Sequence, residues 1–238
     1  MCYSVESSLK TSLLSLVAII YLISSGIPHF QWIGITLIGW CGMQFAELLL
    51  WLTDPRNGCT FWNEVITMTL IPLVLALQPL GSLWGSTILF PWDKSSPARK
   101  YFMLAHTMSV LIWVYSQHYY NPTKYCTTVT KGGHLYWTTV KNGDKQHDKV
   151  THNRLVVVYL VWAALVILPL LLFWNRNILL ILLITFIPTF GFFAGLLTDS
   201  RASIWCHYTS YTSVISVICL FIQQTGIYDF IAPSSFHF

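Results

Sequence analysis

Residues 32–52 read WIGITLIGWCGMQFAELLLWL, an apolar stretch of 21 residues that contains one acid, Glu47. A helix rises 1.5 Å per residue, so 21 residues extend about 30 Å, the thickness of the hydrocarbon core of a bilayer. The stretch therefore predicts a membrane-spanning helix and raises the question of why an ionisable group lies inside it.

The composition of the whole chain agrees with a membrane protein. Of its 238 residues, 55% are hydrophobic and 9% are charged, whereas soluble domains carry about 25% charged residues. The 11 Trp residues fit rings at the level of lipid headgroups. The net charge of +4 includes no arginine-rich stripe, which argues against a nucleic-acid partner. The lipid bilayer is the expected partner.

Counting apolar runs gives the expected fold, an all-α transmembrane bundle of seven helices in a single membrane domain, 1–238. The expected spans are 11–28, 32–52, 65–90, 101–117, 155–174, 177–198 and 204–226. The run 11–28 also fits a secretory signal peptide cut after Gly26, and this alternative stays open.

The loop 118–153, between the fourth and fifth expected helices, has a different composition. It has Thr, Val, Tyr and Trp at strand density, interrupted by Gly-Gly at 132–133 and Asn-Gly at 142–143. Such turn residues between β-prone runs predict a small extramembrane β-hairpin. The hairpin is also a candidate binding surface for a protein partner.

The six cysteines do not form the pattern of a disulfide scaffold, but one bridge, Cys59–Cys126, is compatible with the sequence. With seven spans, nine of the 13 Lys and Arg residues lie on the side of the N-terminus and the loop 118–153. Because positive charge accumulates on the cytoplasmic side, the count predicts a cytoplasmic N-terminus in a multi-pass membrane protein.

Glu47 belongs to a polar and aromatic stripe on its helix. Trp40, Gln44, Glu47 and Trp51 are spaced by 4, 3 and 4 residues and share one face. A carboxylate in hydrocarbon costs roughly 2.5–3.5 kcal/mol, so this face should point into the bundle. Glu47 is then either a structural hydrogen-bond anchor or a group with a transport, proton-handling or catalytic role.

Successive spans cross the membrane in opposite directions. This alternation places most of the polar residues of the spans near one membrane face, the face next to the loop 118–153. They predict a polar pocket lined by Gln44, Glu47, Asn63, Thr67, Gln78, Gln117, Ser203, Cys206 and His207. On the last helix, Ser203, Cys206, Ser210 and Ser213 form one stripe, a pattern that also occurs where helices pack closely.

Three functions are compatible with these features. The first is a non-enzymatic protein that binds or conducts a small solute or a proton through the pocket around Glu47. The second is a structural or host-interaction membrane protein that acts through the loop 118–153. The third is an intramembrane metal-dependent lipid hydrolase that uses Asp199, Ser203 and His207. Because clustered histidines are missing, the sequence predicts no metal site and no cofactor, and it favours a non-enzymatic role.

Three separated motifs occur in order along the chain: Met-Gln-x-x-Glu-x-x-x-Trp, Gln-Pro and Ser-x-Trp-Cys. They fall on Met43, Gln44, Glu47, Trp51, Gln78, Pro79, Ser203, Trp205 and Cys206. Together they resemble the pattern of an uncharacterised polytopic membrane protein family of large DNA viruses, algae and protists. The resemblance covers two helices and a short C-terminal piece. It implies a multi-pass protein of a host-cell or viral membrane, and it implies no reaction.

Overall fold

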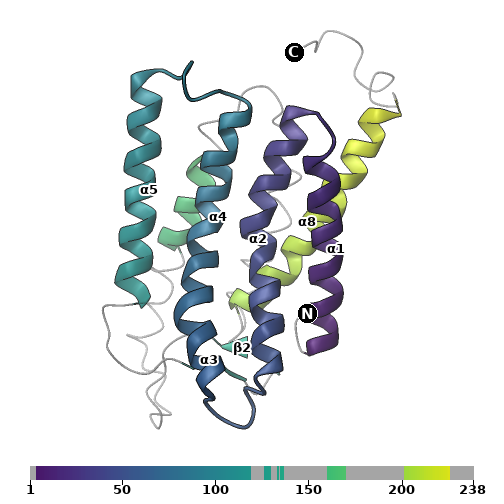
Figure 1. Cartoon of the computed structure of the whole chain (residues 1–238), viewed down its shortest axis with the longest axis vertical. Helices are drawn as coiled ribbons and strands as arrows, with labels where there is room; N and C mark the ends of the chain where they lie inside the picture. Colours follow the sequence, from purple (N-terminus) through teal and green to yellow (C-terminus); the bar gives the residue numbers. More distant parts are fainter. Residues whose placement is uncertain are drawn as a thin grey trace.

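The computed structural model describes residues 4–118, 126–129, 133, 135–136, 160–169 and 201–225, with the side chains of all of these except 117–118, 136 and 201–207. Its main elements are α1 (Val5–Ile23), α2 (Pro28–Leu52), α3 (Phe61–Val65), η1 (Ile66–Leu70), α4 (Ile71–Gly85), η2 (Ser86–Ile88), α5 (Pro97–His118), β1 (Thr128–Val129), β2 (Leu135–Tyr136) and α8 (Arg201–Gln224). A further helix covers Leu160–Pro169. Helices α5, α4, α2 and α1 lie side by side in that order, with Leu160–Pro169 and α8 behind them (Figure 1).

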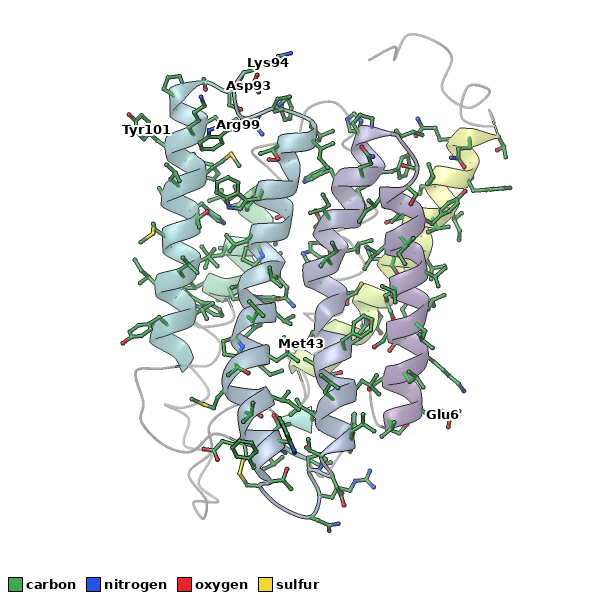
Figure 2. All side chains as sticks on the ribbon, viewed as in Figure 1. Glu6, Met43, Asp93, Lys94, Arg99 and Tyr101 are labelled. Atoms are coloured by element: carbon green, nitrogen blue, oxygen red, sulfur yellow. A yellow bond between two sulfur atoms is a disulfide. The ribbon has the colours of Figure 1, made fainter. Side chains whose placement is uncertain are left out.

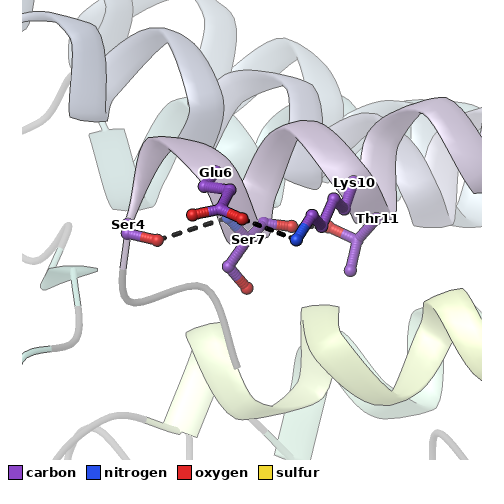
Figure 3. Close-up of polar contacts among 5 residues, drawn as sticks. All are labelled: Ser4, Glu6, Ser7, Lys10 and Thr11. Carbon is purple, nitrogen blue, oxygen red and sulfur yellow. Dashed lines mark hydrogen bonds and ion pairs between the residues drawn. The ribbon is translucent and has the colours of Figure 1, made fainter.

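Local signals at the start of α1 explain where this helix begins. The Ser4 side chain caps the helix by accepting a hydrogen bond from the Ser7 backbone N–H at 3.2 Å. One turn further, Glu6 and Lys10 form an exposed ion pair at 2.6 Å (Figure 3). The helix ends before a turn in which Gly26 has a φ of +72°, a conformation that glycine adopts without strain.

Helix α2 packs closely on α4. A Cβ atom added to Gly39 would lie 2.3 Å from the Leu77 carbonyl oxygen and 2.8 Å from the Gln78 nitrogen. The glycine therefore allows one backbone to approach the other, as small residues do between membrane helices. The Trp32 indole N–H strengthens the same interface by donating to the Ser82 carbonyl at 2.8 Å.

The third long helix, 61–88, contains a π-helical turn, η1, in which the Ile71 N–H bonds the Ile66 carbonyl. Pro72 follows immediately and has no N–H with which to continue the ordinary α-helical pattern toward Met68. We attribute the wide turn to this proline, since its ring also clashes with a carbonyl four residues earlier.

Burial in α1 is the reverse of the pattern in a soluble amphipathic helix. Its inner face contains three serines with 0% exposure, and its outer face contains leucines and other apolar residues. The buried serines are Ser8, Ser12 and Ser15, and the exposed residues include Leu13, Leu14, Val17 and Ile20. Large apolar side chains that face outward are typical of surfaces that contact lipid or a protein partner.

The expectation of seven spanning helices is wrong. In the part of the chain that the structure describes, three helices are long and apolar enough to cross a membrane: α1, α2 and the continuous helix Phe61–Ile88. Helices α5 and α8 have the length, but their polar residues make them less apolar than a typical span, and Leu160–Pro169 has only 10 residues. The predicted run 177–198 lies outside the described residues.

The predicted extramembrane β-hairpin is also corrected. Strands β1 and β2 pair antiparallel, with Thr128 opposite Tyr136 and Val129 opposite Leu135, but each strand has two residues. Leu135 is 2% exposed and belongs to the main hydrophobic core. The described piece of the loop 118–153 is therefore packed against the helices and is not a separate lobe, and most of the remaining loop lies outside the described residues.

Candidate functional site: a polar interface between three helices

Helices α1, α2 and α8 meet along an interface that is polar and buried. Helix α1 contributes Ser8, Ser12 and Ser15, spaced by four and three residues, so that their side chains lie on one face. The hydroxyls of Ser8 and Ser12 are buried and form no hydrogen bond within the described residues. Both therefore keep bonding capacity toward a small polar species.

Helix α2 links the other two helices through Gln44, whose side chain is fully buried. The Ser15 hydroxyl donates to Gln44 Oε1 at 3.0 Å, and Gln44 Nε2 donates to Thr209 Oγ1 at 3.5 Å. One turn away, the Cys41 thiol donates to the Thr209 carbonyl at 3.8 Å. These contacts join residues that are up to 168 positions apart in the chain.

Helix α8 contributes a face of buried hydroxyl residues, which comprises Thr209, Ser210, Thr212, Ser213 and Ser216. Three of the hydroxyls bond carbonyls of their own helix: Thr212 donates to Tyr208 at 3.5 Å, Ser213 to Ser210 at 2.6 Å, and Ser216 to Thr212 at 2.8 Å. Such bonds let a hydroxyl stay inside an apolar environment, because its donor is satisfied locally.

Glu47 lies one turn after Gln44 on α2, and its side chain has 0% exposure. An ionised carboxylate in this position is expensive in a bilayer unless nearby polar groups offset the cost. The interface thus combines an acid, an amide and several hydroxyls on three helices. Such groups are suited to binding a proton or a small polar solute.

Two other predicted pocket residues, Asn63 and Thr67, lie in a separate cluster around Thr127. Asn63 Oδ1 accepts from the Thr127 N–H at 2.8 Å, and Asn63 Nδ2 donates to the Thr127 carbonyl at 3.0 Å. The Thr67 and Thr127 hydroxyls are 2.8 Å apart. A disulfide between Cys59 and Cys126 fixes the same segment, with 5.6 Å between the two Cα atoms. This cluster anchors the segment before β1 to α3 and η1.

Gln78 is buried in α4, where its backbone nitrogen faces Gly39 of α2. It takes part in neither cluster, and its Oε1 has no hydrogen-bond partner within the described residues. The side chains of the remaining predicted site residues lie outside the described part of the chain; they are Gln117, Asp199, Ser203, Cys206 and His207. Their membership of a pocket or an active site stays a prediction.

Sequence reasoning missed the α1 serines and Thr209. The spacing of Ser8, Ser12 and Ser15 carries a signal for one polar helix face. Their pairing with α2 and α8 depends on long-range packing. Within the described residues, His, Cys, Asp and Glu form no group of three that is able to hold a metal ion.

Comparison with protein-family models, with curated proteins and with solved structures finds no match to this chain. The three apolar helices are compatible with a membrane protein, and any function has to be argued from the buried polar interface.

Proposed function

We propose that the chain is a multi-pass integral membrane protein that binds or conducts a proton or another small polar solute at the interface of α1, α2 and α8. The reversed burial of α1 supports membrane insertion, because leucines face outward and serines face inward. In lipid this arrangement satisfies both kinds of side chain, whereas in water both would be unfavourable.

The single observation that carries the proposed function is the burial of Glu47 one turn from Gln44, whose side chain bonds hydroxyls of α1 and α8. Ionisable residues inside membrane helices are rare because of their cost, and they commonly mark proton relays or solute pathways. The open hydroxyls of Ser8 and Ser12 add capacity for a bound water or polar solute. Buried hydroxyls without partners are costly, so occupation by such a species stabilises the site.

The resemblance to the viral, algal and protist family is part of this proposal. Its longest motif falls on Met43, Gln44, Glu47 and Trp51, all of which are buried. Burial of the whole motif fits residues that serve an interior site. The proposal that the protein resides in a host-cell or viral membrane rests on this resemblance.

The test is proton flux into liposomes that contain the purified full-length chain and a trapped pH-sensitive dye. After an imposed pH step, we expect the wild-type protein to raise proton entry above that of protein-free liposomes. We expect Glu47→Gln, which keeps the shape of the side chain and removes the titratable group, to return the flux to the protein-free level. Glu6→Gln is the matched control, because the Glu6 carboxylate is exposed.

Two results would contradict the proton function: wild-type flux equal to that of protein-free liposomes, or flux unaffected by Glu47→Gln. In either case Glu47 is a packing element. The structural or host-interaction function of the loop 118–153 would then be favoured, with the Cys59–Cys126 bridge as its anchor.

A further inference from the structure

The connection between α4 and α5 and the first turn of α5 carry three cations, two of which lie over aromatic rings. The cations are Lys94, Arg99 and Lys100, and the rings of the cluster are Trp84, Phe90 and Trp92. Figure 2 shows Lys94 and Arg99 at one end of the helices, with Glu6 toward the opposite end. Aromatic and basic residues gather in this way where a helix leaves the hydrocarbon and enters the headgroup layer.

The geometry of this cluster is fixed by specific contacts. Arg99 Nη2 lies 3.1 Å from the Ser86 hydroxyl, and its guanidinium carbon lies 4.5 Å above the Phe90 ring. Lys100 Nζ lies 5.5 Å from the centre of the Trp92 ring. Trp92 in turn stacks on Trp84, with 5.6 Å between the ring centres. The rings therefore form an ordered base below the positive charges.

Lys94 and Lys100 have charge available for a ligand. Within the described residues neither lysine forms an ion pair, and Glu6–Lys10 is the salt bridge found there. Lys94 is exposed and Lys100 is half-buried. Residues 89–100 contain the three cations and one acid, Asp93, so their net charge is +2.

The disulfide indicates which side of the membrane this end faces. Cys59 of the Cys59–Cys126 bridge belongs to the connection between α2 and α3, which lies at the opposite end of the helices from the α4–α5 connection (Figure 1). Because disulfides persist in oxidising compartments and are rare in the cytosol, that end belongs outside the cytosol and the α4–α5 connection belongs in it. The described side chains near the disulfide end, Glu6, Lys10, Asp54, Arg56 and Glu64, are three acids and two bases. This orientation is the reverse of the one predicted from all 13 Lys and Arg residues.

We propose that Lys94, Arg99 and Lys100, next to the rings of Phe90 and Trp92, form a binding site for the phosphate headgroup of an anionic lipid in the cytosolic leaflet. That leaflet carries the anionic lipids of a cell membrane, and each nearby Lys or Arg contributes about 1 kcal/mol of attraction. The acyl chains of the lipid lie along the apolar outer faces of α4 and α5, where Leu77, Leu104 and Met108 are exposed.

The first experiment measures lipid binding to the full-length chain in neutral detergent micelles. The readout is the quenching of Trp fluorescence by lipids with brominated acyl chains. Phosphatidylserine is compared with phosphatidylcholine that carries the same acyl chains. We expect half-quenching at a lower mole fraction of phosphatidylserine. Replacing both lysines, with Lys94→Gln and Lys100→Gln, removes two attractions and weakens phosphatidylserine binding roughly 30-fold, which corresponds to about 2 kcal/mol. Arg99 is left intact because it bonds Ser86.

Arg56→Gln is the matched control, since Arg56 also lies over a tryptophan, at 5.4 Å from the Trp51 ring, but at the disulfide end. We expect this variant to retain the preference for phosphatidylserine. Equal quenching of the wild-type protein by both lipids would overturn the proposal. The proposal would also be overturned if Arg56→Gln lost as much of the preference for phosphatidylserine as the double lysine variant. That result would indicate that the lipid responds to the total charge of the protein and not to this site. Melting curves verify that each variant is folded.

The second experiment tests the side of the membrane by labelling intact cells with a membrane-impermeant maleimide. Asn57→Cys and Ser96→Cys place thiols in exposed connections at opposite ends. Relative to the parent chain, we expect added labelling for Asn57→Cys alone. Added labelling for Ser96→Cys alone would overturn the assignment to the cytosolic leaflet. Both measurements are independent of Glu47, so they separate this proposal from the proton function.

Discussion

Gly39→Ala tests the close contact between α2 and α4. The added methyl group would lie 2.3 Å from the Leu77 carbonyl oxygen, whereas ordinary contact begins at 3.4 Å. Since the obstacle is backbone and no flexible side chain is available to move away, the two helices have to separate by about 1 Å, the difference between these distances. We therefore expect the substitution to disturb the whole interface.

The expected cost follows from two opposing effects. A gap of 0.5–1 Å removes about a quarter to a half of the dispersion attraction between facing atoms, and overpacking costs roughly 1–3 kcal/mol. Alanine recovers about 1 kcal/mol, because it favours helix more than glycine does. We expect a net loss of about 1 kcal/mol in the free energy of unfolding, which lowers the Tm by roughly 2–4 °C.

The assay is thermal unfolding of the purified protein in detergent, followed by Trp fluorescence. Gly42→Ala is the control on the same helix, because its added methyl group would meet Val74 side-chain atoms at 3.5 and 3.7 Å, which is ordinary contact. We expect its Tm to be unchanged or slightly raised. A Gly39→Ala protein that melts with the wild type, or a Gly42→Ala protein that loses as much stability, would refute the proposed backbone contact.

Two further predictions concern the anchored segment and the polar interface. Cys59→Ser removes a bridge between residues 67 positions apart. In a loop-closure calculation this costs about 4 kcal/mol, so a reducing agent should lower the Tm of the wild type and leave that of the variant unchanged. Ser15→Ala leaves the buried Gln44 Oε1 without the Ser15 donor and should cost about 1–3 kcal/mol. Ser109→Ala, whose exposed hydroxyl bonds its own helix, should melt with the wild type.

The parts of the fold that depend on local composition could be predicted from the sequence. The run 32–52 lies within α2, and the helix begins four residues earlier because Pro28 is favoured at a first helical position. The number of spans was wrong because apolar runs were counted without regard to their polar faces. Helix α5, for example, buries His106, which bonds the Leu165 carbonyl at 3.0 Å.

The π-helical turn η1 changes the direction of Gln78 relative to Thr67. On a regular helix, Thr67 and Gln78 are 11 residues apart and point in nearly the same direction. The wide turn uses one additional residue, which rotates Gln78 by about 100° relative to that expectation. Asn63 and Thr67 bind Thr127, and Gln78 lies against α2. A sequence pattern with a fixed period of 3.6 does not contain this shift.

The separation of Gln44 from Thr209, 165 residues, has a consequence for biogenesis. Ribosomes add about 5–20 residues per second, so α2 waits roughly 10–30 s for the helix that covers its polar face. During this time Gln44 lacks its Thr209 partner, and α2 is covered only by helices made earlier than α8. The insertion machinery, or early pairing of the first two helices, has to shelter this hydrophilic strip from acyl chains until α8 is made.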